Sequence, residues 1–307
     1  MMYKQTHLAR PSRNAGRKLG GVDSFKYKLD CSSRISVDNP TTHDWLAIDR
    51  LLSSDKSHQV LLAKLLQIHK AVVVKFGLPG EIRTDYEIGN IIKDIPNMIK
   101  YYCKFTCNDT VTNLVTQDYR LKPFICNGTG LQLGFIIMPY YALGDLNSFS
   151  WTRATFAVLK NILKQVVTSL LYAFEKHNFV HGDLHLMNIL LRKTKKTHIV
   201  YGSYSVAVAE SYYAVIMDYG KSQIVPNGAL ELLRDLQVLF GCLPSLEVSD
   251  IIINAVDMSR LTRLLQQQKA PALQQSVYDE AWRIVDTMTI LYAKSERPPI
   301  PNFAYVM

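Results

Sequence analysis

The sequence predicts an α+β protein in which an antiparallel sheet comes first and a mainly helical region follows. Short apolar runs separated by polar turns fill residues 45–75. A long amphipathic pattern covers residues 154–177, and helical periodicity dominates from Leu230 onward. The predicted division is a basic extension, a sheet region and a helical region, at residues 1–44, 45–139 and 140–307.

The sheet region is predicted from alternating apolar and polar segments. Runs such as WLAI, VLLAKLL and KAVVVKF in residues 45–75 favour antiparallel strands. The sequence Thr84-Asp-Tyr-Glu87 has the form of a capping box, which predicts a helix from there through about Lys93. Two more strands are expected, near residues 123–126 and 131–138, with a glycine-containing turn between them.

The helical region begins with a long predicted helix over residues 154–177. Its apolar side chains recur every three to four positions, at Leu159, Leu163, Val166, Val167, Leu170 and Phe174. The segment FVHGDLHLMNILL at residues 179–191 follows directly and concentrates polar groups in an apolar run. A strand is predicted over residues 212–220, ending in Asp-Tyr-Gly.

Composition is typical of a folded protein, with 48% hydrophobic and 20% charged residues among 307. No apolar run approaches the roughly 18–20 residues that cross a bilayer, so no transmembrane segment is expected. The polar, basic N-terminus does not resemble a signal peptide. Five scattered cysteines favour a reducing compartment and thiols without disulfides. We therefore expect an intracellular protein, cytoplasmic or associated with a virion.

The net charge of +9 is concentrated near the N-terminus. Residues 1–28 hold seven basic residues and one acidic residue, a local net charge of +6, which leaves about +3 for the rest. A basic segment of this composition is most often a solvated extension. Binding to an acidic partner, nucleic acid or an anionic membrane surface is the alternative.

Three polar residues suggest a site for phosphate chemistry. Asp183 and Asn188 stand five residues apart after the long helix, and Asp218 ends a later strand. If the strands that adjoin Asn188 and Asp218 pair, the two side chains converge. A carboxylate and an amide oxygen suit Mg²⁺, which usually takes one or two protein ligands beside substrate phosphates. Asp183 would then accept a proton from an attacking hydroxyl.

A nucleotide site also needs a cation over the phosphates. Lys75 ends the apolar run of residues 71–74, so its ammonium would emerge from a buried strand. Such a flexible lysine needs an anchor, and Glu87 on the predicted helix could supply one. Taken singly, a lysine or glutamate in these positions is usually just exposed. Their joint occurrence, in this order, is what indicates nucleotide binding.

These motifs resemble those of the protein-kinase-like superfamily: a lysine ending the V-A-I-K strand, a helix glutamate, the H-R-D-L-x-x-x-N loop and D-F-G. The matching residues in this sequence are VVVK ending at Lys75, Glu87, the loop His181–Asn188, and Asp218-Tyr-Gly220. The resemblance covers about residues 45–245. It implies a two-lobed fold with an antiparallel-sheet N-lobe and a mainly helical C-lobe, which binds ATP and Mg²⁺.

The same resemblance implies further site residues. The segment IIMPYYALGDL at residues 136–146 is similar to the hinge between the lobes. It would place Met138 as gatekeeper, Tyr140 along the adenine and Asp145 near the ribose. Asp235 resembles the helix aspartate that braces the catalytic-loop backbone.

The sequence departs from the family pattern at several points. Residues 51–64 align with the glycine-rich loop but lack its glycines, which puts the grip on ATP by that loop in doubt. Gly182 replaces the arginine that precedes the catalytic aspartate, which implies independence from activation-loop phosphorylation. His185 stands where a lysine is usual in Ser/Thr kinases. The segment after Gly220 is short and has no A-P-E motif.

The leading interpretation is a divergent Ser/Thr protein kinase, of a type that large DNA viruses encode, acting on an unidentified protein substrate. Gly220 and the hinge support it. A small-molecule phosphotransferase, similar to aminoglycoside or choline kinases, is the first alternative because of His185 and the short segment after Gly220. A pseudokinase scaffold is the second, because the glycines are absent and the N-terminal tail is basic. Against a scaffold, Lys75, Asp183, Asn188 and Asp218 are all present.

Overall fold

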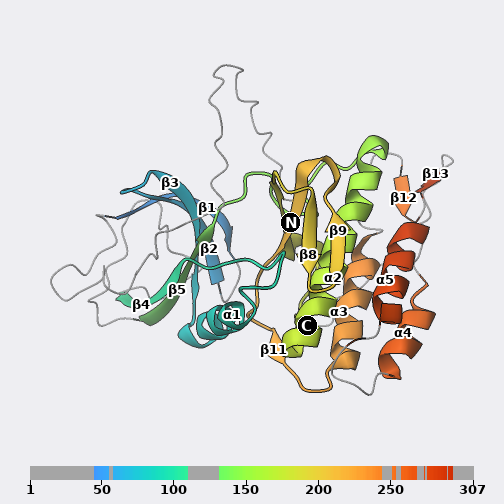
Figure 1. Cartoon of the computed structure of the whole chain (residues 1–307). Coiled ribbons are helices and arrows are strands. Elements are labelled where there is room, and N and C mark those ends of the chain that lie inside the picture. Colours follow the sequence, from blue (N-terminus) through green and yellow to red (C-terminus); the bar gives the residue numbers. More distant parts are fainter. Residues whose placement is uncertain are drawn as a thin grey trace, which may run out of the picture.

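The computed structural model describes residues 45–54, 58–109, 131–243, 251–253, 257–267, 273, 275–288 and 290–292. The basic extension at residues 1–44 and the strand predicted at 123–126 lie outside the described residues. Within them, the chain is a mixed α+β structure with its largest sheet in the sheet region and its longest helix in the helical region (Figure 1).

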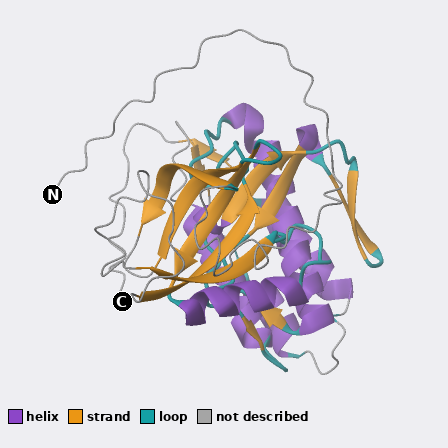
Figure 2. Ribbon diagram, turned by 90° about the vertical axis from the view of Figure 1, so that its left-hand side faces the viewer, coloured by secondary structure: helices purple, strands orange, loops and turns teal. Residues whose placement is uncertain are grey.

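Five antiparallel strands form the main sheet, in the order β1-β2-β3-β5-β4. Their bounds are β1 Leu46–Ser54, β2 His58–Leu65, β3 Lys70–Gly77, β4 Cys103–Asp109 and β5 Leu131–Pro139. The antiparallel strands predicted from the alternating runs at residues 45–75 and at 131–138 are confirmed. Figure 2 shows strands gathered side by side, with helices behind and around them.

Helix α1, Pro79–Ile91, packs against β5 and β3. It begins at Pro79 instead of Thr84, so the predicted capping box is wrong. Proline at the first helical position has its φ preset and lacks the N–H that would be unpaired there, which makes it the stronger start signal. Thr84 lies inside the helix, where its hydroxyl donates to the carbonyl of Gly80 at 3.2 Å.

The helical region is built around α2, Phe156–His177, preceded by the short helix η3, Arg153–Thr155. The helix predicted at residues 154–177 is thus confirmed. Helices α3 Ala229–Cys242 and α5 Gln275–Thr287 pack against α2, and α4 Ser259–Gln266 packs against α3 and α5. By length and composition alone the segment Arg153–His177 could cross a membrane, but 61% of its most apolar stretch is buried inside the protein, as expected of a core helix.

Short strands between α2 and α3 carry the polar motifs. Strands β7 Ile189–Lys193 and β10 Tyr212–Ile216 pair antiparallel, and β6 Phe179–Val180 pairs with β11 Gln223–Ile224. The remaining elements are η4 Leu186–Asn188, β8 His198–Tyr201, β9 Tyr204–Ala207, η5 Ala209–Ser211, β12 Ile251–Ile253 and β13 Ile290–Tyr292. Strand β10 ends before the predicted residue 220, because Asp218 adopts a φ of 66° that no strand accommodates.

Two hydrophobic clusters hold the described residues together. The smaller lies within the sheet region and includes Trp45, Phe105 and Phe135. The larger fills the helical region and also takes in Ile82 of α1 and Met138 of β5. Because this second core includes residues of both regions, it joins α1 and β5 to the helices and fixes the place where the polar motifs meet.

One cysteine departs from the sequence-based expectation. Cys103, at the start of β4, is disulfide-bonded, although the scattered cysteines predicted none. The number and spacing of cysteines do not report which of them the fold brings together, so this pairing could not be inferred from them.

Candidate functional site

The loop from His181 to Asn188 is held by Asp235 of α3. The two carboxylate oxygens of Asp235 accept hydrogen bonds from the backbone N–H groups of His181, at 2.6 Å, and of Gly182, at 2.8 Å. The buried His181 ring is also bonded through Nε2 to the carbonyl of Met217, at 2.9 Å. The bracing role that the sequence suggested for Asp235 is confirmed, and the loop is thereby fixed to two separate segments.

Gly182 occupies a position that only glycine fits. Its φ is 76°, and a Cβ atom there would lie 2.5 Å from the carbonyl oxygen of Lys221. Both the backbone conformation and the close approach of the segment after Gly220 therefore exclude a side chain. This packing gives a physical reason for glycine directly before Asp183.

Asn188 and Asp218 are brought to neighbouring strand ends, as predicted. Asn188 directly precedes β7 and Asp218 closely follows β10, and Ile189 pairs with Ile216 between those strands. The backbone N–H of Met217 donates to the carbonyl of Asn188 at 3.0 Å. The strand pairing on which the convergence of the two side chains depended is thus present.

The Asn188 amide is oriented by its own loop. Its Nδ2 lies 3.0 Å from the carbonyl of Asp183 and 3.2 Å from His185 Nε2, and the residue is only 4% exposed. With the amide nitrogen committed to these acceptors, the amide oxygen is the atom left for a cation. Burial lowers the pKa of His185, which disfavours the charged form of this ring beside Asn188.

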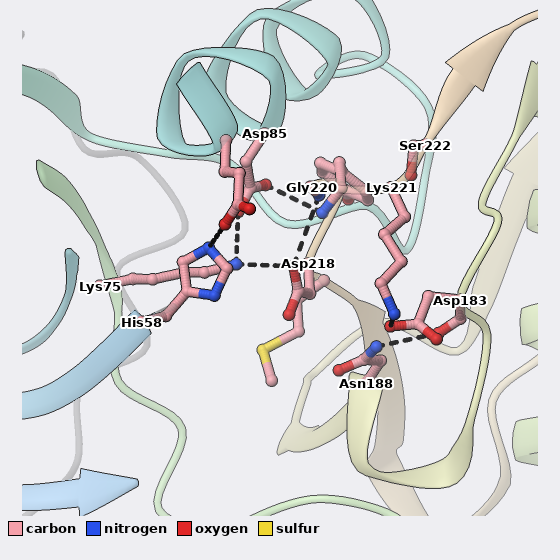
Figure 3. Close-up of polar contacts among 12 residues, drawn as sticks. His58, Lys75, Asp85, Asp183, Asn188, Asp218, Gly220, Lys221 and Ser222 are labelled. Atoms are coloured by element: carbon pink, nitrogen blue, oxygen red, sulfur yellow. Dashed lines mark hydrogen bonds and ion pairs between the residues drawn. The ribbon is translucent and has the colours of Figure 1, made fainter. Parts of the chain in front are cut away.

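Asp183 lies on the open side of the loop. Its side chain is 35% exposed, and Lys221 Nζ stands 3.1 Å from its Oδ2 atom. His185 Nε2 lies farther away, at 4.0 Å. This partly exposed carboxylate is therefore accessible to a substrate, and Figure 3 shows Lys221 reaching it from the segment after Gly220.

Lys75 occupies the buried side of the site, on β3. Its Nζ atom donates to Asp85 Oδ2 at 2.8 Å and to Asp218 Oδ1 at 2.6 Å. Burial alone would lower the pKa of Lys75, but the two carboxylates outweigh it and raise that pKa above its ordinary value. Burial would likewise raise the pKa of Asp218, and Lys75 instead holds it below the usual range. Lys75 and Asp218 are therefore both charged at neutral pH.

The anchor of Lys75 differs from the prediction. Asp85, not Glu87, contacts the ammonium, and the Glu87 side chain is 57% exposed with its nearest cation, Lys104, 3.6 Å away. Residues two apart on a helix point about 200° apart, so only one of them can face the sheet. The buried face of α1 runs through Ile82, Asp85 and Gly89, a helical spacing that was readable in the sequence.

Asp85 and Tyr219 connect α1 to the segment after β10. Besides Lys75, Asp85 accepts hydrogen bonds from the hydroxyl of Tyr101 and from the backbone N–H of Tyr219, the latter at 2.9 Å. The fully buried Tyr219 hydroxyl donates to the carbonyl of Ile216 at 2.8 Å. The Asp-Tyr-Gly motif is therefore fastened on both sides, which fixes the Asp218 carboxylate beside Lys75.

The donor set fits a magnesium ion. Among the described residues, no group of three or more His, Cys, Asp and Glu side chains gathers as a metal cluster. An ionised Asp218 and the amide oxygen of Asn188 would nevertheless suit Mg²⁺, because that ion commonly keeps one or two protein ligands and takes the rest from phosphates and water. Both residues can thus hold a metal together with a phosphate-bearing substrate.

The residues predicted to contact the nucleotide lie where β5 leaves the sheet. Met138 is 5% exposed and pairs with Val73, and Tyr140, just beyond the end of β5, is half-buried. Asp145 Oδ1 accepts from the N–H of Ser148 at 2.7 Å, which gives this carboxylate a turn-stabilising role as well. Contact of these three residues with adenine or ribose stays a prediction.

The segment that aligns with the glycine-rich loop spans the end of β1 and the start of β2, and residues 55–57 are outside the described chain. At the start of β2, His58 Nε2 lies 2.7 Å from Glu81 Oε2 of α1. A hollow of about 530 Å³ lies elsewhere, between the start of α1 and strands β4 and β5, and none of its lining residues belongs to the site.

Comparison with known proteins identifies no activity for this chain. No family model matches the sequence. A segment covering 22% of the chain is 32% identical to "Uncharacterized protein 098R" of Invertebrate iridescent virus 6, over 12% of that protein. A segment covering 47% of the chain is 23% identical to "Uncharacterized protein ZK177.2" of Caenorhabditis elegans, over 46% of that protein. The chain thus spans less than half the length of each of these relatives.

Proposed function

We propose that the protein is an ATP- and Mg²⁺-dependent phosphotransferase with a two-lobed protein-kinase-like fold, most simply a divergent Ser/Thr protein kinase. One observation carries the proposal. Lys75 of the sheet region contacts Asp218 of the helical region at 2.6 Å, on the side of Asp218 away from Asp183 and Asn188 (Figure 3). One site then contains groups from three separate segments: the cation Lys75, the candidate magnesium ligands Asp218 and Asn188, and the candidate base Asp183.

Each residue has a distinct role in this proposal. Lys75, held by Asp85, positions the α- and β-phosphates of ATP, and Asp218 with Asn188 holds Mg²⁺. The metal, when bound, neutralises charge on the phosphates. Asp183 orients the substrate hydroxyl and accepts its proton, while the hydroxyl oxygen bonds to the γ-phosphorus. The bond from that phosphorus to the β–γ bridging oxygen breaks, and its electron pair leaves with ADP.

A small-molecule acceptor is the second candidate, and the chain path after Gly220 favours it. Strand β11 follows almost at once and pairs with β6, and α3 begins at Ala229. Little chain remains there to form a platform for an extended peptide. A protein substrate would therefore bind through other surfaces, whereas a small alcohol would need only the opening beside Asp183.

The deciding experiment incubates the full chain with Mg²⁺ and γ-labelled ATP. Acceptors are an acidic protein, a basic protein, an aminoglycoside and choline. Asp183→Asn should lower transfer by at least about a hundredfold, since a positioned general base typically contributes 10²–10⁴ in rate. The matched control is Asp286→Asn, which alters an exposed aspartate paired with Lys164 on the surface and should retain full transfer.

The label's destination separates the two candidates: incorporation into protein favours a protein kinase, and incorporation into a small acceptor favours the alternative. Undiminished transfer by Asp183→Asn would contradict the assigned base. Binding of Mg-ATP without transfer to any acceptor, or to the protein itself, would support a pseudokinase scaffold instead.

A further inference from the structure

A second lysine reaches the open side of the candidate site. Lys221 follows the Asp-Tyr-Gly motif directly, and its Nζ atom lies 3.1 Å from Asp183 Oδ2. Figure 3 shows its side chain extending from the motif toward Asp183 and Asn188. The Lys221 side chain is 71% exposed, in contrast to the 7% of Lys75. Lys75 is thus a buried cation of the site, and Lys221 is a solvent-exposed one.

The backbone that carries Lys221 is fixed even though its side chain is not. The N–H of Ser222 donates to the carbonyl of Tyr219 at 3.0 Å, and the Ser222 hydroxyl donates to the carbonyl of His181 at 2.8 Å. On the other side, the Lys221 carbonyl packs against Gly182, where a Cβ would approach it to 2.5 Å. Because residue 182 has no side chain, the backbone of Lys221 can lie next to the loop that carries Asp183.

The two lysines are suited to different parts of a triphosphate. Lys75 is held between Asp85 and Asp218 and can reach only a ligand that enters the buried side. As transfer proceeds, negative charge is spread over the oxygens of the outer phosphate and the departing bridging oxygen, and a cation close to them stabilises that state. Lys221 is the described lysine whose ammonium lies beside Asp183.

We propose that Lys221 is a catalytic residue that binds the γ-phosphate of the nucleotide, an inference that rests on the proposed phosphotransferase function. Without nucleotide, its ammonium pairs with Asp183. With a triphosphate bound, the ammonium turns to the γ-phosphate oxygens, donates hydrogen bonds to them and keeps its own protons. This exchange frees the Asp183 carboxylate to accept the substrate proton, while the phosphorus passes from the β–γ bridging oxygen to the acceptor oxygen.

Nucleotide binding provides the first test, because it does not depend on turnover. The Kd values of ATP and ADP are measured with Mg²⁺ for the full chain, for Lys221→Met and for Lys221→Arg. We expect the preference for ATP over ADP to fall about tenfold in Lys221→Met, the loss typical of a hydrogen bond to a charged group, and to persist in Lys221→Arg. Lys195→Met, in an exposed turn, is the matched control and should not change the ratio.

The rate of transfer provides the second test. Lys221→Met should lower kcat by roughly 10- to 100-fold, near the lower end for loss of one group that stabilises charge in a transition state. Because Lys221 is exposed, the midpoint of thermal unfolding should stay unchanged. His185 lies 4.0 Å from the same Asp183 oxygen, so His185→Lys can deliver an ammonium to this place from the loop itself. Adding it to Lys221→Met should restore much of the rate.

The outcomes separate this inference from the proposed function. If the unmodified protein binds ATP and transfers phosphate, but Lys221→Met changes neither the ATP-to-ADP ratio nor kcat, then the contact with Asp183 is only a surface ion pair and the inference is wrong. If the unmodified protein does not bind ATP at all, the proposed function fails first. Rescue by His185→Lys would exclude a purely structural role for Lys221.

Discussion

Two carboxylates of the site each contact a lysine, and their surroundings are opposite. On the inner side, Asp85 and Lys75 have side chains that are 1% and 7% exposed, and Asp85 also accepts from Tyr101 and Tyr219. On the outer side, Asp183 and Lys221 are 35% and 71% exposed. The inner pair has fixed partners at every charged group, whereas the outer pair can exchange its partners for a ligand.

The difference indicates a division between structure and chemistry. Breaking a buried ion pair leaves an uncompensated charge in a place that water does not reach, so the inner pair holds α1 in place. An exposed pair contributes little to stability because water solvates both partners. We therefore expect changes on the inner side to reduce stability and changes on the outer side to affect mainly ligand binding and rate.

The largest effect is expected from Asp85→Ala. The change leaves the Tyr101 hydroxyl and the Tyr219 N–H without their acceptor and removes one of the two carboxylates that neutralise Lys75. Removing one partner of a buried ion pair costs about 3–5 kcal/mol. The free energy of unfolding, measured by urea denaturation followed by circular dichroism, should fall by about that amount, and phosphate transfer should be lost with the position of Lys75.

Glu87→Ala is the control for this prediction, since it changes an exposed acid on the same helix. Its effect on the free energy of unfolding should stay within about 0.5 kcal/mol, as for most surface substitutions. If Glu87→Ala proved the more damaging of the two, the assignment of Asp85 as the anchor of Lys75 would be wrong. The pair of variants thus tests the correction that the structure makes to the sequence-based choice.

A smaller effect is expected where the inner and outer sides meet, at Gly182. Gly182→Ala places a Cβ against the Lys221 carbonyl in a left-handed backbone conformation, which should cost about 1–3 kcal/mol of stability. Because the segment with Lys221 must shift, transfer should fall as well. Gly241→Ala in α3 meets no atom within 4 Å and should instead stabilise the protein, by about 0.5–1 kcal/mol. Equal effects of both variants would contradict a special packing role for Gly182.

How well each feature could be predicted from the sequence depends on how far apart along the chain its contacting residues lie. Alternating runs and helical periodicity identified the antiparallel strands and α2, because these patterns reflect burial of one face and need no knowledge of distant contacts. The convergence of Asn188 with Asp218 followed from the expectation that the two adjoining strands pair. Each of these inferences needed only local pattern and one assumption about topology.

The features that were missed have two different causes, a local pattern that was not used and a contact between distant segments. Glu87 was chosen by its order among motifs, whereas the phase of α1 decides which acid faces Lys75, and Asp85 shares the buried phase of Ile82 and Gly89. Lys221 had no local signal, because its importance comes from the approach of its backbone to Gly182. Glycine at residue 182 was noticed in the sequence, but the close approach of the Lys221 carbonyl to it could be seen only in the fold.

The smallest effect is expected from Ser222→Ala. This change removes a hydrogen bond that anchors the backbone beside Lys221 and alters no charged group. The Ser222 side chain is buried, and its hydroxyl donates to the carbonyl of His181. Loss of one such hydrogen bond costs about 1 kcal/mol, whereas the exposed Ser205→Ala control should cost less than about 0.5 kcal/mol. If the anchored backbone is what presents Lys221, then kcat should fall severalfold in Ser222→Ala while the Kd of ADP stays constant. A variant that loses stability but keeps its full kcat would indicate that Lys221 finds its place without this anchor.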